Sequence, residues 1–379
     1  MKDVVIVEAV RSPIGKRDGK LSSVLPVHLM ARVLQALLAR SGIDPALVED
    51  VILGCVTPIG EQGANIARLA ALQAGLPMHV PAASLNRMCG SGQQAIHFAA
   101  QVIAAGDMDV VIAGGIEVMS RVPLGSDWPK AWPPDFPYAL VSQGISAEMM
   151  AEKWHLTREE LDCFAYESHV KAAAATRRGD FAREIVPIEV KLPDGVTDTL
   201  TYDEGIRFEP DLGKMSKLQP VFKEGGVITA ANSSQISDGA AAVLLMSADK
   251  ASALGLKPRA RIAARYVIGD DPVLMLSAPI PATRAALERA GLRLDDLSVI
   301  EINEAFASVV LAWQKELQPD PARVNPNGGA IAMGHPLGAT GAILMTKLLH
   351  HLERAGDRYG LQTMCIGHGM ATATVIERV

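Results

Sequence analysis

The chain has only four cysteines, and their spacing excludes two common uses of this residue. Cys55, Cys89, Cys163 and Cys365 form no C-x-x-C pair and no dense framework in a chain of 379 residues. Metal binding and structural disulfides are therefore not expected, and no residue is assigned as a metal ligand. Free thiols at this density are typical of a reducing compartment, so we expect a cytoplasmic protein.

The chain also lacks a long hydrophobic run, a signal peptide and an excess of positive charge. No apolar stretch approaches the length that crosses a bilayer. Residues 1–3 lead directly into Val4-Val5-Ile6-Val7, a pattern that predicts a short strand and not a secretory signal. The net charge is -6 with acidic and basic residues interspersed, so the sequence shows no broad surface for nucleic acid.

Aromatic residues make up only 4% of the chain, whereas apolar residues together make up 49%. The apolar fraction is therefore mostly small and branched side chains, a mixture that suits the closely packed helices and sheets of an α/β protein. A chain of this length can form two or three domains with a large core.

Short apolar strands alternate with helices over the first part of the chain, which indicates βαβ units. The predicted helices end at glycines, a common helix stop. Strands are predicted at residues 3–9, 51–54 and 109–115, and helices at residues 26–41, 64–74 and 93–105.

The pattern changes in the middle of the chain and then repeats. Prolines and tryptophans in residues 122–138, and a charged helix that starts with the capping-box pattern Thr157 to Glu160, indicate an insertion. Afterwards the order of polar turn, glycines, long helix, Ala-Gly-Asp and apolar strand returns, with Ala355-Gly356-Asp357 matching Ala105-Gly106-Asp107. We therefore predict a duplicated βα core. Its first half is residues 1–118 plus 237–258, the insertion is 119–236, and the second half is 259–379.

Cys89 lies in Asn86-Arg87-Met88-Cys89-Gly90-Ser91-Gly92, immediately before a predicted buried helix. Free backbone N–H groups and the helix dipole at such a position favour a thiolate, which indicates a nucleophile. The alternative is a structural cysteine, because free cysteine is among the most buried residue types.

The second half offers three more candidates, each of which also has a purely structural interpretation. Asn303 follows an apolar strand and could cap a helix, His335 in Gly334-His335-Pro336 could be a satisfied loop histidine, and Cys365 could belong to the core. Glycines around His335 and after Cys365 let a ligand approach the backbone closely. A reactive cysteine, a histidine to activate it and a second cysteine among N–H donors together indicate acyl transfer.

Five motifs in family order, covering essentially the whole chain, resemble the thiolase family. They are Asn86 to Gly92, Gly114-Gly115-Ile116-Glu117-Val118-Met119-Ser120, Asn303-Glu304-Ala305-Phe306-Ala307, Asn327 to Pro336, and Cys365-Ile366-Gly367-His368-Gly369. The resemblance implies the α/β thiolase fold, in which two similar halves form five layers, αβαβα, with an inserted loop domain. It also implies an acyltransferase of fatty acid metabolism and β-oxidation.

The resemblance also implies a role for each matching residue. Cys89 is the expected nucleophile that becomes acylated, and His335 draws its proton. His335 then forms one oxyanion hole with Asn303, which acts through a water. Cys365 is the acid/base at the α-carbon of acetyl-CoA, and the N–H groups of Cys89 and Gly367 form a second oxyanion hole.

Coenzyme A is the co-substrate that the resemblance implies, with no permanently bound cofactor. The insertion is expected to bind it, with Arg207 near the adenine and Ser234 at the pantetheine arm. An alternative for Arg207 is a solvated surface charge, since exposed arginines are common.

Three departures from the family pattern concern the substrate and the oligomer. Ser142-Gln143-Gly144 stands where short-chain members often have His-Met-Gly, so a wider acyl pocket is expected. Residues 122–138 are short where tetrameric members carry a longer loop, so a homodimer is expected at least as much as a dimer of dimers. His368 stands where many members have glycine, and it is assigned no role.

The leading prediction is CoA-dependent thiolytic cleavage of 3-ketoacyl-CoA, or the reverse Claisen condensation, through acyl-Cys89. The alternatives are an acetyltransferase that forms acetoacetyl-CoA, a decarboxylating ketoacyl synthase, and a non-catalytic acyl-CoA-binding scaffold. A ketoacyl synthase usually pairs its nucleophile with two histidines, which the Cys365 motif contradicts. The sequence leaves acyl length and direction open.

Overall fold

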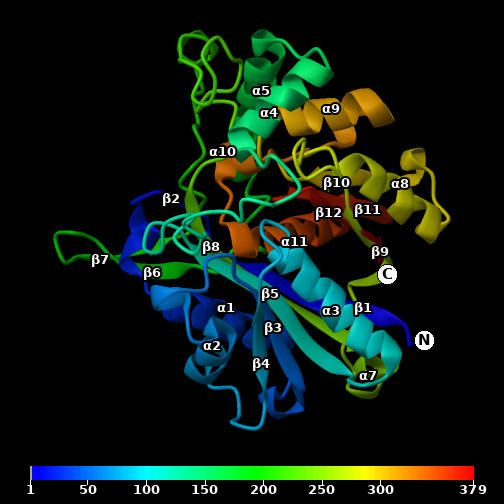
Figure 1. Cartoon of the computed structure of the whole chain (residues 1–379). Helices are drawn as coiled ribbons and strands as arrows, with labels where there is room; N and C mark the ends of the chain where they lie inside the picture. The colour runs from blue at the N-terminus through cyan, green and yellow to red at the C-terminus, as the bar shows by residue number, and fades with distance from the viewer. Residues whose placement is uncertain (1) are drawn as a thin grey trace.

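The computed structural model describes residues 2–379 and contains one large mixed sheet and one small hairpin (Figure 1). The order of strands in the large sheet is β10-β11-β12-β9-β1-β8-β5-β3-β4, and β2 pairs with β8. Its strands are β1 (Val4–Arg11), β2 (Gly15–Lys16), β3 (Asp50–Gly54), β4 (Ala82–Leu85), β5 (Val110–Val118), β8 (Ser237–Ser247), β9 (Ala260–Gly269), β10 (Val299–Ile302), β11 (Tyr359–Ile366) and β12 (Met370–Arg378).

The two halves of this sheet repeat one pattern of strand pairing. In the first half β3 runs parallel to β5, β5 pairs antiparallel with β8, and β8 pairs antiparallel with β1. In the second half β10 runs parallel to β11, β11 pairs antiparallel with β12, and β12 pairs antiparallel with β9. The halves join where β1 and β9 pair. This repeated topology confirms the predicted duplication.

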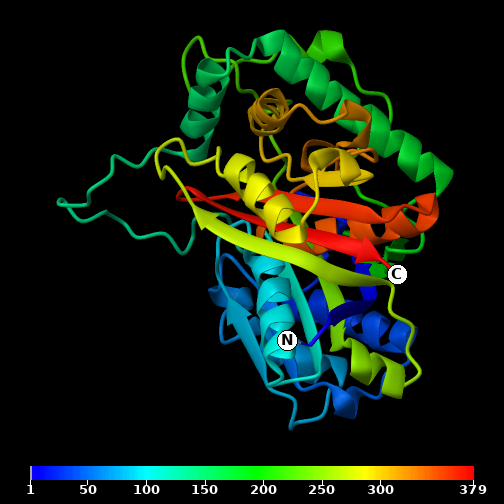
Figure 2. The same ribbon diagram turned by 90° about the vertical axis from the view of Figure 1, so that its right-hand side faces the viewer.

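Helices α3 (Ser91–Ala105) and α11 (Leu337–Ala355) form a layer between the two halves of the sheet. Helix α11 contacts β5 and β8 on one side and β10 and β11 on the other. Helices α1 (Pro26–Ser41) and α2 (Ile66–Ala74) cover the outside of the first half, and α8 (Pro279–Ala290) covers the second. In Figure 2, α8 (yellow) and α3 (cyan) lie on opposite sides of β9 and β12. The order of layers is αβαβα, as predicted.

The middle layer is buried on both faces because its side chains are small. Ala95, Ala99, Ala339 and Ala342 are fully buried between the sheets. The helices approach so closely that a Cβ atom on Gly341 would lie 2.1 Å from the backbone nitrogen of Gln93. Glycine at this helix position therefore allows a separation that a larger residue would prevent.

Residues 119–236 form most of the upper part of the molecule in Figure 1. They contain α4 (Gln143–Lys153), α5 (Arg158–Arg178), the hairpin of β6 (Ile188–Lys191) and β7 (Thr197–Leu200), and α6 (Leu212–Met215). Thr157 and Glu160 form the predicted capping box at the start of α5. The other α-helices are α7 (Ala248–Ala253), α9 (Ala307–Leu317) and α10 (Ala330–Met333), and short 3-10 turns occur at Lys20–Ser23, Pro45–Leu47, Gly60–Gln62, Leu294–Asp296 and Pro321–Arg323.

Several element boundaries differ from those that the sequence predicts. Helix α1 has the predicted bounds, but α2 begins two residues late because Asn65 is left-handed (φ 58°) and caps it through Arg68 N–H. Strand β1 continues to Arg11, two residues beyond the end of the predicted strand at residues 3–9. Among residues 2–379, no helix is both long and apolar enough to cross a membrane.

Candidate active site

Cys89 is held in a tight turn between β4 and α3. Asn86 Oδ1 accepts a hydrogen bond from Met88 N–H at 2.8 Å, and Asn86 Nδ2 donates to Val56 O at 2.9 Å. Met88 has a left-handed backbone (φ 46°), and Ser91 Oγ donates to its carbonyl at 2.6 Å. The turn thus fixes Cys89 just before the first residue of α3, as the sequence predicts.

The thiol of Cys89 is buried, with 5% exposure, and burial raises its pKa. Hydrogen bonds from the Gln143 side chain, from Gly367 N–H and from its own N–H act in the opposite direction, but burial is the largest effect. The expectation that the helix start favours a thiolate is therefore wrong for the resting site. Cys89 is a protonated thiol at neutral pH, and it needs a base to become a nucleophile.

His335 lies between α10 and α11 and is oriented by two neighbours. Its Nδ1 lies 2.6 Å from Thr340 Oγ1, and its Nε2 lies 3.3 Å from Asn303 Nδ2. Thr340 Oγ1 already donates its proton to Pro336 O at 2.9 Å, so it can only accept from Nδ1–H. Burial lowers the pKa of His335 to about 4. The imidazole is therefore neutral at pH 7, with its lone pair on Nε2.

Asn303 follows β10, and its backbone N–H donates to Thr363 O at 3.0 Å. Its side chain is fully buried, and Oδ1 has no partner among residues 2–379. It caps no α-helix, since the N-terminal cap of α9 is Phe306. The capping interpretation is therefore wrong, and the amide group is instead directed at His335.

Cys365 and Gly367 come from the end of β11 and the turn that follows it. Cys365 is 1% exposed, and burial together with the negative charge of a Cys89 thiolate raises its pKa. The end of β11 packs against the turn that holds Cys89, since a Cβ on Gly90 would lie 2.2 Å from Ile366 Cδ1 and a Cβ on Gly367 would lie 3.5 Å from Met88 Cγ. Gly367 N–H reaches Cys89, so this turn supplies both a second thiol and a backbone donor at the same place.

Cys89 faces a largely apolar cavity of about 390 Å³. Residues from several elements line it, among them Val56, Leu124, Trp128, Phe222, Phe306 and Leu337. The rings of Phe222 and Phe306 meet edge to face, with centroids 6.0 Å apart. A concave apolar site with a few polar groups at one end is typical of a small-molecule site.

Gln143, the first residue of α4, is a site residue that sequence reasoning missed. Its side chain hydrogen-bonds the Cys89 thiol. The only signal in the sequence was that residues 142–144 depart from the short-chain pattern. Ser142 gives a second signal in retrospect, because its Oγ caps α4 through Ile145 N–H and so fixes where Gln143 starts.

The two residues predicted to bind CoA lie outside this cluster. Ser234 N–H donates to Ala305 O at 2.9 Å, which places Ser234 beside the Phe306 end of the apolar cavity. Arg207 is exposed, and its N–H donates to His169 Nδ1 at 3.1 Å. None of the described hydrogen bonds of Arg207 joins it to the catalytic candidates.

A buried carboxylate joins the two halves behind the site. Glu117 in β5 accepts hydrogen bonds from Val56 N–H at 2.8 Å and from Gly338 N–H in α11 at 2.9 Å. It also accepts from Gln62 Nε2 at 2.7 Å. Burial raises the pKa of Glu117, while these donors oppose the shift. Glu117 therefore fixes the turn next to His335 relative to the turn next to Cys89.

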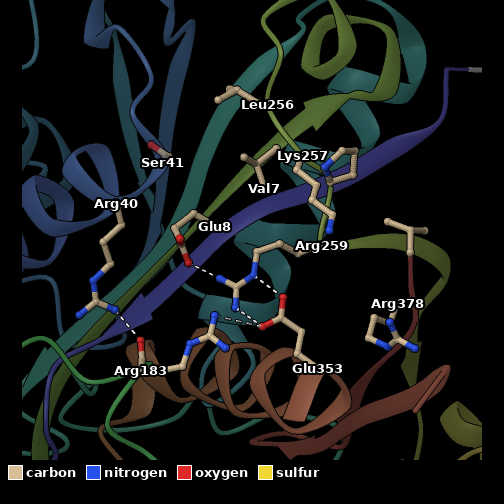
Figure 3. A pocket seen from close by; sticks show the side chains of 12 residues that line it. Val7, Glu8, Arg40, Ser41, Arg183, Leu256, Lys257, Arg259, Glu353 and Arg378 are labelled. Carbon is tan, nitrogen blue, oxygen red and sulfur yellow. Dashed lines mark hydrogen bonds and ion pairs between the residues drawn. The ribbon is translucent and has the colours of Figure 1, made fainter. Parts of the chain in front are cut away.

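A separate, strongly charged cleft of about 480 Å³ contains none of the predicted site residues (Figure 3). Arg259 lies at its centre and pairs with Glu8 and with Glu353, the latter at 2.7 Å. Arg40 and Arg183 also line it. With no thiol and a lining in which charged side chains predominate, this cleft is unsuited to the acyl chemistry that the sequence predicts.

Comparison with known proteins agrees with this geometry. The family model described as "Thiolase, N-terminal domain" matches residues 4–249, and "Thiolase, C-terminal domain" matches residues 256–378. The chain is 50% identical to the steroid 3-ketoacyl-CoA thiolase FadA6 of Mycobacterium tuberculosis, across all of this chain and 95% of the relative. It is 45% identical to a 3-ketoacyl-CoA thiolase of Aeromonas salmonicida across the whole of both chains.

The fold also matches that of a solved structure. The crystal structure of the acetyl-CoA acetyltransferase of Bacillus anthracis superposes with a TM-score of 0.93 and 40% sequence identity, covering 100% of this chain and 99% of the other. Both family models and the fold therefore lead to one conclusion: the chain belongs to the thiolase family.

Proposed function

We propose that the chain is an acyltransferase that cleaves 3-ketoacyl-CoA with CoA, giving acetyl-CoA and a shortened acyl-CoA. One observation carries this proposal. The turn that follows Cys365 packs against the turn that holds Cys89, and Cys89 faces an apolar cavity, so a second buried thiol and the Gly367 N–H group come to the side of the first thiol. A hydrolase needs one nucleophile, whereas carbon–carbon cleavage also needs an acid at the carbon that leaves.

The first step is activation of Cys89 by His335. The depressed pKa of His335, about 4, keeps it neutral, and Thr340 holds the proton on Nδ1. Nε2 then carries the lone pair, which accepts a long hydrogen bond from Asn303 Nδ2 at 3.3 Å in the resting site and takes the proton of the Cys89 thiol when the substrate is bound. The sulfur attacks the 3-keto carbon, and the oxygen that becomes negative is stabilised by the N–H groups of Cys89 and Gly367.

In the second step the bond between C2 and C3 of the substrate breaks, and its electron pair goes to C2. Cys365 gives its proton to C2, so acetyl-CoA leaves and the acyl group stays on Cys89. His335 and Asn303 stabilise the enolate oxygen, with a water acting beside Asn303. The raised pKa of Cys365 supports this role, because it keeps the thiol protonated until a strongly basic carbanion forms.

In the third step the thiol of free CoA gives its proton to the Cys365 thiolate and attacks the acyl group, and Cys89 leaves as a thiolate that takes back the proton held by His335. The same groups run the steps backward as a Claisen condensation. Formation of acetoacetyl-CoA is the alternative function, favoured by the similarity to a structure titled acetyl-CoA acetyltransferase. The names of the relatives at 44–50% identity favour 3-ketoacyl-CoA cleavage instead.

We assign CoA binding to the insertion, residues 119–236, between the two halves 1–118 with 237–258 and 259–379. Ser234 would meet the pantetheine arm, since it adjoins the Phe306 end of the cavity that contains Cys89. Arg207 would lie near the adenine, and its exposure is equally that of a solvated charge. No permanently bound cofactor is needed for the steps above.

The test compares Cys89→Ser and Cys89→Ala with Cys163→Ser as the matched control, since Cys163 is a partly exposed thiol on α5. Each protein is incubated with CoA and either acetoacetyl-CoA or longer 3-ketoacyl-CoA, and acetyl-CoA is quantified. We expect loss of thiolysis by at least about 1,000-fold in the Cys89 variants only. Mass spectrometry of a trapped intermediate should find the acyl group on Cys89.

Thiolysis at the wild-type rate by Cys89→Ala would refute the proposal. Condensation that needs a malonyl thioester, without thiolysis, would identify a decarboxylating ketoacyl synthase. Tight acyl-CoA binding without turnover and without acylation of Cys89 would identify a binding scaffold.

We further propose a cytoplasmic homo-oligomer. Strand β4 ends the sheet, with no partner on its outer side among the described strands. The exposed apolar residues Leu69 and Leu72 lie on α2, which packs against β4, and Phe98 lies on α3, which packs against the neighbouring strand β3. Exposed sheet edges beside apolar patches are typical of interfaces, so a second copy of the chain is the proposed occupant.

A further inference from the structure

A second cavity of about 170 Å³ adjoins the one that contains Cys89. Both are lined by Met88, Trp128, Ser142 and Gln143, so they meet beside the reactive thiol. The second cavity continues past Gly367 to His368. A substrate whose keto carbon is at Cys89 therefore has space on two sides.

The two cavities border different parts of the site. The first leads to Phe306, which is next to Ala305 and therefore close to Ser234, the residue assigned to the pantetheine arm. If the CoA arm occupies that side, the second cavity is left for the rest of the acyl chain. The assignment rests on the proposed function.

The second cavity concentrates residues with unusual backbone conformations. Met88, Met275 and His368 all line it, and each has a left-handed backbone, with φ of 46°, 59° and 63°. This conformation is unfavourable for residues with a side chain, and such outliers gather at functional sites. His368 is the most informative, because glycine would fit its turn without strain.

The imidazole of His368 is not engaged by the protein. Its Nδ1 is buried with no hydrogen-bond partner among residues 2–379. Its ring is in edge contact with Trp132, with centroids 6.0 Å apart. A neutral imidazole has one donor and one acceptor nitrogen. A hydrogen-bond partner at Nδ1 would fix which of the two nitrogens carries the proton. Without that partner, the ring can offer either a donor or an acceptor to a ligand.

The other polar side chains of this cavity are already committed. Ser142 Oγ caps α4, and Gln143 bonds the Cys89 thiol. The remaining walls are mostly apolar, with Leu140 and Met275 among them, and the indole N–H groups of Trp128 and Trp132 can donate but cannot accept. Among the side chains that line the described cavity, only His368 has a buried polar atom without a hydrogen-bond partner.

We propose that His368 hydrogen-bonds an oxygen atom on the acyl tail of the substrate. The preferred substrates are then 3-ketoacyl-CoA thioesters whose tail carries a hydroxyl or ketone group, in place of a plain alkyl chain. An alkyl tail would cover the imidazole and leave its polar nitrogen without water or another hydrogen-bond partner, which reduces the binding free energy. An oxygen atom on the tail would supply that hydrogen bond. A site that hydrogen-bonds a polar group of its substrate discriminates strongly against analogues that lack this group.

The experiment measures kcat/KM for a matched pair of substrates: 3-ketooctanoyl-CoA and the same thioester with a hydroxyl group near the end of the tail. The variants are His368→Phe, which keeps a ring but no hydrogen bond, His368→Asn, which keeps a donor and an acceptor, and His368→Gly. Wild type should prefer the hydroxylated substrate by about tenfold or more. The ratio should fall toward one in His368→Phe and His368→Gly and be partly retained in His368→Asn.

Thermal unfolding separates this role from a structural one. Because glycine suits a left-handed turn, His368→Gly should unfold at the same temperature as wild type or higher, while losing the preference. Equal kcat/KM for the two substrates in wild type, or an unchanged ratio in His368→Phe and His368→Gly, would overturn the proposal. Cleavage of neither substrate by wild type would instead refute the proposed function.

Discussion

At the scale of single residues, the hydrogen bond between Thr340 and His335 decides where the histidine can accept a proton. Thr340 Oγ1 gives its own proton to Pro336 O, so it accepts from Nδ1 and leaves the lone pair on Nε2. The other tautomer would place a proton on Nε2 and block the proposed base. Thr340 is therefore a positioning residue, buried one helical turn along α11.

We predict that Thr340→Val lowers kcat for thiolysis by about 10- to 100-fold and changes KM little, because it alters the tautomer and not the binding walls. Thr340→Ser keeps the hydroxyl and should retain most of the activity. Steady-state kinetics with one 3-ketoacyl-CoA substrate checks both variants. A Thr340→Val enzyme with wild-type kcat would show that the tautomer does not depend on this bond.

Much of the candidate site could be predicted at this scale, since Cys89, Asn303, His335 and Cys365 all lie in recognisable motifs. The direction of the Cys89 pKa shift could not be predicted from the sequence. The helix start was visible in the sequence, but the burial of the thiol depends on residues from far along the chain that surround it, among them Phe222 and Leu337. Desolvation outweighs the helix dipole in this case.

At the scale of elements, the site depends on how closely α3 and α11 pack. A Cβ on Gly341 would lie 2.1 Å from Gln93 N, and a Cβ on Gly92 would lie 2.7 Å from Gly338 O. The turn with Cys89 leads into α3 and the turn with His335 leads into α11. The spacing of these two helices therefore sets the spacing of the two turns.

We predict that Gly341→Ala destabilises the protein by about 3 kcal/mol, since its methyl group meets backbone atoms that cannot rotate away. It should also reduce thiolysis by moving the two turns apart. Gly269→Ala is the control, because a Cβ there has no atom within 4 Å. Urea unfolding measures the stability, and equal unfolding midpoints for the two variants would contradict the close-packing argument.

The sequence predicts the interiors of these elements better than their ends. Helix α1 has a regular apolar face and a Gly42 stop, and it was predicted with its true bounds. The sequence predicts that the first strand ends at Ala9, before Arg11. Arg11 is instead the buried end of β1, paired with Glu184 at 2.8 Å and Asp203 at 2.7 Å. Its two partners lie far away in sequence, and no local pattern reveals them.

At the scale of the whole molecule, the proposed catalytic groups come from both halves of the duplication. Cys89 belongs to the first half, while Asn303, His335 and Cys365 belong to the second. Glu117 joins them by accepting N–H groups from both sides, at Val56 and Gly338. The halves also share a continuous sheet through β1 and β9. A rigid connection of this kind suits a reaction that needs groups from both halves held in fixed positions.

The arrangement of the whole molecule also bears on its oligomeric state, because β4 ends the sheet close to the turn that holds Cys89. Phe98 on α3 is 39% exposed beside this edge, and Met78 before β4 is 86% exposed. We predict that wild type is at least a dimer and that Phe98→Glu weakens its self-association by about 100-fold, since twofold symmetry introduces the charge twice into the interface. Val196→Glu is the control, on an exposed valine of the β6–β7 hairpin. Sedimentation equilibrium over a range of concentrations measures both, and a monomeric wild type, or equal association of the two variants, would place the interface elsewhere.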